Sequence, residues 1–432
     1  MQAYILETGR RISPFDEPVG EMLVHNRRLR DHQKAVLESL GCQVQPIDDL
    51  RQVRQLPCVL VYDDVYFTYH AAAKFVALAR RRQKEGGSPQ GSKSSGNFAA
   101  ALPVSLLTER FVPSFQGRTV QAADGSSCHA YDFYYLRDWD PEAAPADQAE
   151  LISVPHYVTV RRWRVNRYFD SSGSYSLPMS TVAFCPVQHW SSLLAANVLG
   201  MPSFIVRSAI EAKFRTATTP LRMLWRAASI WPYRLRGKIY FAGPGCKVHP
   251  TAHVEWAVLG RGVRIGPNAV VRGAVLGDRV EIGPGALVEM STLAEKATIN
   301  PSSIARSCVV GNEGHIGAYF TQLSVLGNGA VLCPASGIFD FNLRSNVTVN
   351  FEGRSVSCGS RLLGGCLGHG AFLGAEVPMA SGQELPNGCV LVKSPRDVVV
   401  DASQNLPAGV IRVDRGRPRN RPAGTTLRVQ PG

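Results

Sequence analysis

Apolar residues recur every 17 positions along the C-terminal half of the chain, between about residues 242 and 395. One ladder consists of Leu259, Leu276, Leu293 and Val310. A second consists of Val248, Ile265, Ile282, Ile299 and Ile316. A third consists of Val254, Val271, Val288 and Ala305 and ends at Gln322. Three apolar ladders per repeat predict a coil with three short sides, stacked on its neighbours by parallel hydrogen bonding, so we expect a parallel β-helix over 242–395.

A different pattern fills the N-terminal half, where short apolar runs alternate with amphipathic stretches. The runs predict strands at 2–6, 42–47 and 58–62, and the stretches predict helices at 28–40 and 71–82. This alternation favours a Rossmann-like α/β domain over 1–200, with a parallel sheet covered on both faces. A Gly- and Ser-rich segment at 86–97 is predicted to be a flexible loop.

The centre of the chain carries weaker patterns. They predict strands at 104–111 and 151–165 and a helix that begins near His189-Trp190. Apolar residues then repeat at helical spacing from Leu221 to Trp231, with arginines beside them, inside a predicted helical linker over 201–241. This helix either lies on a membrane surface or an acidic partner, or bridges the two domains, and bridging is favoured. The Pro- and Arg-rich segment 396–432 is predicted to be a basic tail.

The net charge of +13 is concentrated in two segments. Residues 203–238 contain eight Lys/Arg against Glu211, and residues 393–432 contain eight against three Asp, which gives local charges of +7 and +5. Such segments suit anionic partners, although a solvated basic surface explains them equally well. Because no nucleic-acid-binding motif accompanies them, nucleic acid is not an expected partner.

Cysteine spacing and hydropathy predict the compartment. Ten cysteines occur without CxxC spacing, which favours reduced thiols over disulfides or a zinc site. No apolar stretch reaches the roughly 20 residues that span a bilayer, and the first residues lack the basic and apolar regions of a signal peptide. We therefore expect a cytoplasmic protein, for which contact with a membrane surface is not favoured.

One run within the repeat region resembles a known family. It consists of Phe341-Asn342-Leu343-Arg344, Val347-Thr348-Val349-Asn350 and, where the coils resume, Gly368-His369-Gly370-Ala371-Phe372-Leu373-Gly374. This run resembles the C-terminal half of sugar-1-phosphate nucleotidyltransferases that carry a hexapeptide-repeat acyltransferase domain. The resemblance implies that the β-helix is left-handed and that the protein is a homo-oligomer, with a trimer expected.

The N-terminal residues resemble the start of an NDP-sugar pyrophosphorylase. The matching residues are Thr8-Gly9-Arg10-Arg11 after the first strand, then Pro14 and Pro18, and Asp63-Asp64 after a later strand. The resemblance implies that Gly9 with Arg10 or Arg11 binds nucleotide and that Asp64 or Asp63 holds Mg²⁺, because attack on a phosphate builds negative charge that cations must offset. The pattern is altered here, since the loop is short and Val19 stands where the family has Lys.

Acyl transfer would require a further set of residues. Acyltransferases of the resembling family use a His as general base between neighbouring prisms. Counting back from Gly327 to the matching position gives Gln322, whose amide is not a base, so His315 and His369 are the candidate substitutes. The residues expected to approach an acceptor or coenzyme A are Asn342, Arg344 and Glu352.

Two functions of different classes are compatible with these residues. The first is a transferase of nucleotide-sugar metabolism, either a sugar-1-phosphate nucleotidyltransferase with Mg²⁺ or a hexapeptide acyltransferase with acyl-CoA, acting on a nucleotide or sugar-phosphate ligand. The second is a catalytically inactive homologue that serves as an oligomeric scaffold or a regulatory ligand-binding protein. Val19 and Gln322 favour the second function, and the strand-end Asp favours the first.

Overall fold

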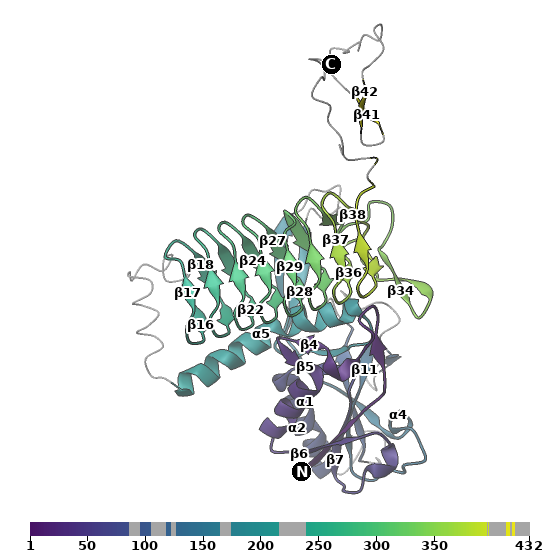
Figure 1. Cartoon of the computed structure of the whole chain (residues 1–432). Helices are drawn as coiled ribbons and strands as arrows, with labels where there is room; N and C mark the ends of the chain where they lie inside the picture. The colour runs from purple at the N-terminus through teal and green to yellow at the C-terminus, as the bar shows by residue number, and fades with distance from the viewer. Residues whose placement is uncertain are drawn as a thin grey trace.

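The computed structural model describes residues 1–85, 96–104, 118–121, 127–164, 174–215, 239–394, 396, 412–414 and 417–419. Within these ranges an N-terminal α/β domain is followed by a long β-helix, as Figure 1 shows. Most of the predicted loop at 86–97, the stretch from Leu221 to Trp231 and most of the basic tail lie outside the described residues. The tail contributes one short described pair of strands, β41 (Arg412–Asp414) and β42 (Arg417–Arg419).

The N-terminal domain is built on a mixed sheet. Its strands are β1 (Gln2–Leu6), β6 (Gln43–Ile47), β7 (Cys58–Tyr62), β9 (Phe98–Pro103), β10 (Arg118–Gln121), β11 (Ser127–Leu136) and β12 (Glu150–Ser153). The order is β12-β9-β11-β7-β1-β6, with β10 paired to β11. The strands β1, β6 and β7 are parallel as predicted, but β11 runs antiparallel to both β7 and β9. The prediction of a parallel sheet is therefore wrong, because β11 lies between β7 and β9 and runs antiparallel to both.

Two helices and several small elements surround this sheet. Helix α1 (Leu29–Ser39) buries one face that includes Leu29, Val36 and Leu37, as its amphipathic pattern predicts. The other elements are α2 (Tyr69–Glu85), α4 (Pro145–Gln148), η1 (Val19–Glu21), η2 (Leu50–Gln52), β2 (Arg11–Ile12), β3 (Glu17–Pro18), β4 (Leu23–Val24), β5 (Arg27–Arg28), β8 (Val65–Phe67), β13 (Thr159–Arg164), β14 (Ser174–Met179) and β15 (Phe184–Pro186). The strand predicted at 104–111 is not found at Val104, because β9 ends at Pro103, and residues 105–111 lie outside the described chain.

Three parallel sheets form the β-helix and confirm the three predicted ladders. The first face consists of β16 (Tyr240–Ala242), β19 (Ala257–Leu259), β22 (Val275–Leu276), β25 (Thr292–Leu293), β28 (Val309–Val310), β31 (Val325–Leu326), β36 (Cys366–Leu367) and β39 (Glu384–Leu385). The second face consists of β17 (Lys247–Val248), β20 (Arg264–Ile265), β23 (Glu281–Ile282), β26 (Thr298–Ile299), β29 (His315–Ile316), β32 (Val331–Leu332), β37 (Phe372–Leu373) and β40 (Val390–Leu391). The third face consists of β18 (His253–Glu255), β21 (Val270–Arg272), β24 (Leu287–Glu289), β27 (Ile304–Arg306) and β30 (Phe320–Gln322), and β33 (Gly337–Ile338) pairs with β38 (Pro378–Met379) farther along. Stacked parallel sheets of this kind are typical of a left-handed β-helix.

The register changes at one coil, and this corrects the placement of Gln322. Ala305 pairs with Thr321, and Arg306 pairs with Gln322. The turn between Ile316 and Phe320 is one residue shorter than in the preceding coils, so the strict 17-residue count overshoots by one. Thr321, which is completely buried, continues the interior ladder, and Gln322 belongs to the outer column of the third face.

The long helix α5 (Trp190–Arg215) joins the two parts of the molecule. It lies between the N-terminal sheet and the first face of the β-helix (Figure 1), where it packs near β4, β16, β19 and β31. One continuous hydrophobic core contains Leu37 and Phe133 of the N-terminal domain, Trp190 of α5, and Val309 and Val325 of the β-helix. The two domains therefore share apolar surface that neither would bury alone.

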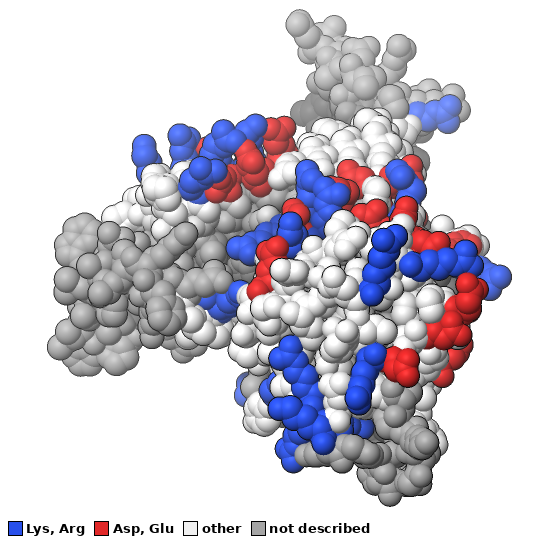
Figure 2. All heavy atoms as spheres, turned by 90° about the horizontal axis from the view of Figure 1, so that it is seen from below, with Lys and Arg blue, Asp and Glu red and all other residues white. Residues whose placement is uncertain are grey.

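Charged side chains pair between successive coils of the β-helix. Ion pairs join Arg261 to Asp278 at 2.8 Å and Arg264 to Glu281 at 2.9 Å. Figure 2 shows neighbouring blue and red groups over this part of the surface, without a field of a single sign. Exposed pairs of this kind contribute about 0–1 kcal/mol each, so burial of the ladders supplies most of the stability. None of the helices within the described residues is long and apolar enough to cross a membrane.

Candidate functional site at the domain junction

The loop that follows β1 is fastened to the loop that follows β7. These parallel neighbours end at the same edge of the sheet, so Thr8 and Asp63 are brought together. The backbone N–H and the hydroxyl of Thr8 both donate to Oδ1 of Asp63, at 3.0 and 2.7 Å. Gly9 follows with a φ of +67°, in the left-handed region that glycine adopts without strain. Asp63 and Gly9 thus shape the loop.

Asp64 points into the protein from the same edge. Its side chain is 5% exposed, and its Oδ2 lies 3.4 Å from Nε of Arg10 and accepts a 3.1 Å hydrogen bond from the amide of Gln188. Its Oδ1 is buried without a hydrogen-bond partner. Burial is the largest influence on this carboxyl group and raises its pKa to about 6, against the opposing effect of the Gln188 hydrogen bond.

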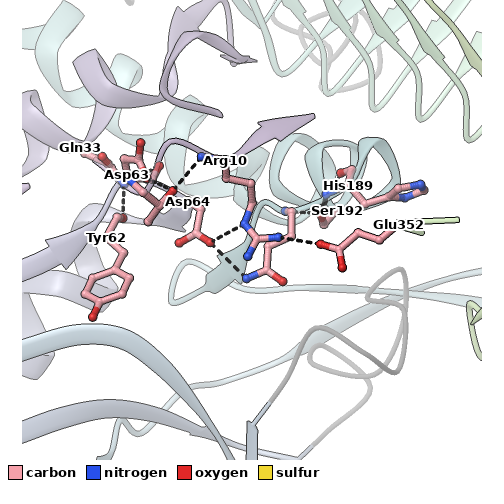
Figure 3. A network of polar contacts seen from close by, with 10 residues as sticks. Arg10, Gln33, Tyr62, Asp63, Asp64, His189, Ser192 and Glu352 are labelled. Carbon is pink, nitrogen blue, oxygen red and sulfur yellow. Dashed lines mark hydrogen bonds and ion pairs between the residues drawn. The ribbon is translucent and has the colours of Figure 1, made fainter. Parts of the chain in front are cut away.

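Arg10 links the two domains electrostatically. Its Nη1 lies 3.6 Å from Oε1 of Glu352, which occupies the tight turn between β34 (Thr348–Phe351) and β35 (Arg354–Ser357). Figure 3 shows Arg10 extended between Asp64 on one side and Glu352 on the other. The sequence assigned Arg10 to a nucleotide site and Glu352 to an acceptor site, and the structure brings both into one cluster.

His189 fixes the position of the hairpin that carries Glu352. Its Nδ1 accepts from the backbone N–H of Ser191 at 3.3 Å, so Nε2 carries the proton and donates to the carbonyl of Asn350 at 3.1 Å. Burial lowers the pKa of His189 to about 4, which keeps the ring neutral. Neither His189 nor Gln188 belongs to a sequence motif. Each contacts a residue more than a hundred positions away in the chain, so the local sequence gave no signal for its role.

Arg11 lies outside this cluster. Its Nε donates to Oδ1 of Asp16 at 2.7 Å, and its Nη2 donates to the backbone carbonyl of the same residue. More than half of the Arg11 side chain is exposed. Of the two arginines considered from the sequence, Arg10 is the one that faces the strand-end carboxylates.

The donor set at the strand ends does not fit a resident Mg²⁺ ion. Magnesium sites use carboxylates together with water and phosphate oxygens in an open octahedral arrangement. Here Asp63 is held by Thr8, and the Arg10 guanidinium already faces Asp64. In the described part of the chain, no group of three His, Cys, Asp or Glu side chains is placed to hold a metal ion.

The other residues expected to take part in acyl transfer lie on separate parts of the β-helix. Gln322 is half-buried on the third face, and His315 is half-buried on the second face, where burial lowers its pKa. Asn342 accepts a 3.1 Å hydrogen bond from the backbone N–H of Arg344 in an exposed loop. These four residues do not form one constellation with Glu352.

His369 lines a pocket of about 380 Å³ between the segment 15–28 and the first face of the β-helix. Its Nδ1 accepts from the backbone N–H of Asn328 at 2.8 Å, so the neutral ring carries its proton on Nε2, which lies 3.3 Å from Oε1 of Glu17. The ring packs 4.9 Å from that of Phe15. In this tautomer the buried Nε2–H faces Glu17, whereas the sequence had made His369 a candidate base.

The comparisons with known proteins concern the repeat region. The family model of the bacterial transferase hexapeptide (six repeats) matches residues 257–289, which form nearly two coils from β19 to β24. The C-terminal domain is a hexapeptide-repeat domain. The match leaves the N-terminal α/β domain without an identified family, and no curated protein matches the chain. This match supports the resemblance to hexapeptide-repeat transferases for the C-terminal domain.

Proposed function

We propose that this protein is a non-catalytic homologue of sugar-phosphate nucleotidyltransferases, with a ligand-binding or scaffolding role. The observation that carries this proposal is the position of Arg10 between Asp64 and Glu352. Nucleotidyl transfer needs uncompensated cations that face the phosphates in the transition state. Here Arg10, the arginine that faces the strand-end carboxylates, has Asp64 on one side and Glu352 on the other.

A second observation supports the same proposal. Val19, which replaces the lysine of the resembling family, is completely buried in the hydrophobic core. It cannot supply a positive charge, and Asp63, Asp64 and Glu352 outnumber Arg10 around the loop. A polyphosphate that approached this edge would therefore meet net negative charge, and the hairpin that carries Glu352 would have to move before Arg10 could reach it.

Calorimetric titration with Mg²⁺-ATP tests whether Arg10 is available to a nucleotide. We expect the native protein and the Arg10→Gln variant to give the same titration curve, which means that no heat of nucleotide binding depends on Arg10. Arg11→Gln is the matched control, because Arg11 is exposed and paired only with Asp16. Saturable binding that is lost in Arg10→Gln and retained in Arg11→Gln would contradict the proposal.

A further inference from the structure

A small cleft opens between α1, α5 and the first residues of α2, and it shares no residue with the strand-end cluster. Its volume is about 40 Å³. Since about 10–15 Å³ on this measure holds one water molecule, the cleft has room for roughly three waters or for one small ion. None of the described residues that line it is Asp or Glu. A small group with negative charge would therefore meet no like charge in this lining.

Two arginines line the cleft from different elements. Arg27 belongs to β5, and its Cζ lies 5.7 Å from the centre of the Phe204 ring. Within the described part of the chain, Arg27 forms no ion pair. Arg207 lies on α5, in the basic segment 203–238, and its Cζ lies 4.6 Å from the centre of the Tyr69 ring. Contact with an aromatic ring holds each guanidinium group at the cleft.

His32 of α1 contributes an acceptor to the same cleft. Its side chain is 8% exposed, and its ring stacks on that of Tyr66 at 4.9 Å. Nε2 lies 2.8 Å from the carbonyl oxygen of Phe67. Because a carbonyl oxygen only accepts, Nε2 carries the proton and Nδ1 keeps its lone pair. Nδ1 has no hydrogen-bond partner among the described residues and is not enclosed, so it is open to a ligand in the cleft.

The electrostatic surroundings keep this ring neutral. Burial is the largest influence on His32 and lowers its pKa to about 4, and the positive charges of Arg27 and Arg207 lower it further. Helix α2 begins at Tyr69 beside the cleft, so the positive end of its dipole adds to the same field. The cleft thus combines positive charge with one neutral acceptor.

We propose that this cleft binds inorganic phosphate in its hydrogen-phosphate form, an oxyanion that keeps one O–H group. Arg27 and Arg207 donate to the charged oxygens, and the O–H group donates to Nδ1 of His32. The volume of about 40 Å³ suits one such ion and excludes a nucleotide. This inference does not depend on the absence of nucleotidyl transfer, because the cleft and the strand-end cluster consist of different residues.

Calorimetric titrations with inorganic phosphate and with sulfate, at mildly alkaline pH and constant ionic strength, test the role of Nδ1. Both ions are tetrahedral dianions under these conditions, but only phosphate has an O–H group. We expect phosphate to bind at least about tenfold more tightly than sulfate, because sulfate leaves the lone pair of Nδ1 facing one of its own. Glycerol 3-phosphate, a monoester that has largely lost its second proton at this pH, should bind as weakly as sulfate. No binding of phosphate, or equal binding of phosphate and either other ion, would overturn the proposal.

Arginine variants test the source of the positive charge. Arg27→Gln and Arg207→Gln should each lower the affinity for phosphate about tenfold, because each removes a charge-assisted hydrogen bond. Arg30→Gln is the matched control, since Arg30 lies outside the cleft and is paired with Glu21. Phosphate binding that is unchanged in Arg27→Gln, or that is lost equally in Arg30→Gln, would contradict the assigned site.

The His32→Gln variant separates the acceptor from the structural hydrogen bond. The glutamine amide can still donate to the carbonyl of Phe67, but it has no counterpart of Nδ1. We expect the affinity for phosphate to fall to that for sulfate, and the affinity for sulfate to stay the same. Equal losses for both ions, or no loss for either, would show that Nδ1 is not the contact. If this variant does not fold, the comparison of phosphate with sulfate in the native protein still decides the question. The ATP titration compares Arg10 variants, so failure of either proposal leaves the other unaffected.

Discussion

Replacing Gly200 by alanine is expected to destabilise the protein by about 3 kcal/mol, at the upper end of what overpacking usually costs. A Cβ atom at Gly200 would lie 1.9 Å from the hydroxyl oxygen of Tyr66 and 2.5 Å from its Cζ. Tyr66 is 1% exposed, and its ring stacks on His32 at 4.9 Å, so it has no free space into which to move. Helix α5 would have to shift away from the N-terminal domain. The midpoint of urea denaturation measures the effect.

A matched glycine elsewhere provides the control for this substitution. Gly337 has no positive φ, and a Cβ there would meet no atom within 4 Å. Gly337→Ala should therefore change the free energy of unfolding by less than about 0.5 kcal/mol. Equal midpoints for the two alanine variants would mean that α5 does not pack against Tyr66 as described.

The second large effect is expected for Trp190→Ala, which should destabilise the protein by about 3–5 kcal/mol. Trp190 is completely buried at the start of α5, within the core that both domains share. Removing the indole leaves a cavity in that core and weakens both domains together. Far-UV circular dichroism and tryptophan fluorescence, followed during the same denaturation, measure the stability and the cooperativity of the transition.

Trp190→Phe keeps an aromatic ring at this position and should cost less than the alanine variant. In both variants the two spectroscopic transitions should shift together, because one core serves the two domains. Two separate transitions, of which Trp190→Ala shifts only one, would contradict the shared core.

The β-helix could be predicted from the sequence because each coil adds one residue to each ladder, so that Leu259, Leu276 and Leu293 repeat the same environment. The shortened turn before Phe320 was missed because the third ladder was extended by a fixed count of 17, although Val310 and Leu326 of the first ladder lie only 16 residues apart. The outward-facing columns of the coils were not predicted from the sequence. In one of them Thr292 lies between Val275 and Val309.

The sheet and the site could be predicted less well, for reasons of geometry. No strand was predicted over β11, where Ser, His and Asp interrupt the apolar residues, and a strand pattern carries no information on direction in any case. Arg10 and Glu352 are more than three hundred residues apart, and a resemblance assigned them to separate activities. Only the packing of the hairpin β34–β35 on His189 brings them together.

Pyrophosphate release tests the central claim, that the strand-end cluster is an ion-pair network without nucleotidyl transfer. The assay combines the four common nucleoside triphosphates with a set of sugar 1-phosphates in the presence of Mg²⁺, for the native protein and for Asp64→Asn. The account predicts that the native protein releases no more pyrophosphate than the variant. Release by the native protein that disappears in Asp64→Asn would contradict it and would make Asp64 a catalytic residue.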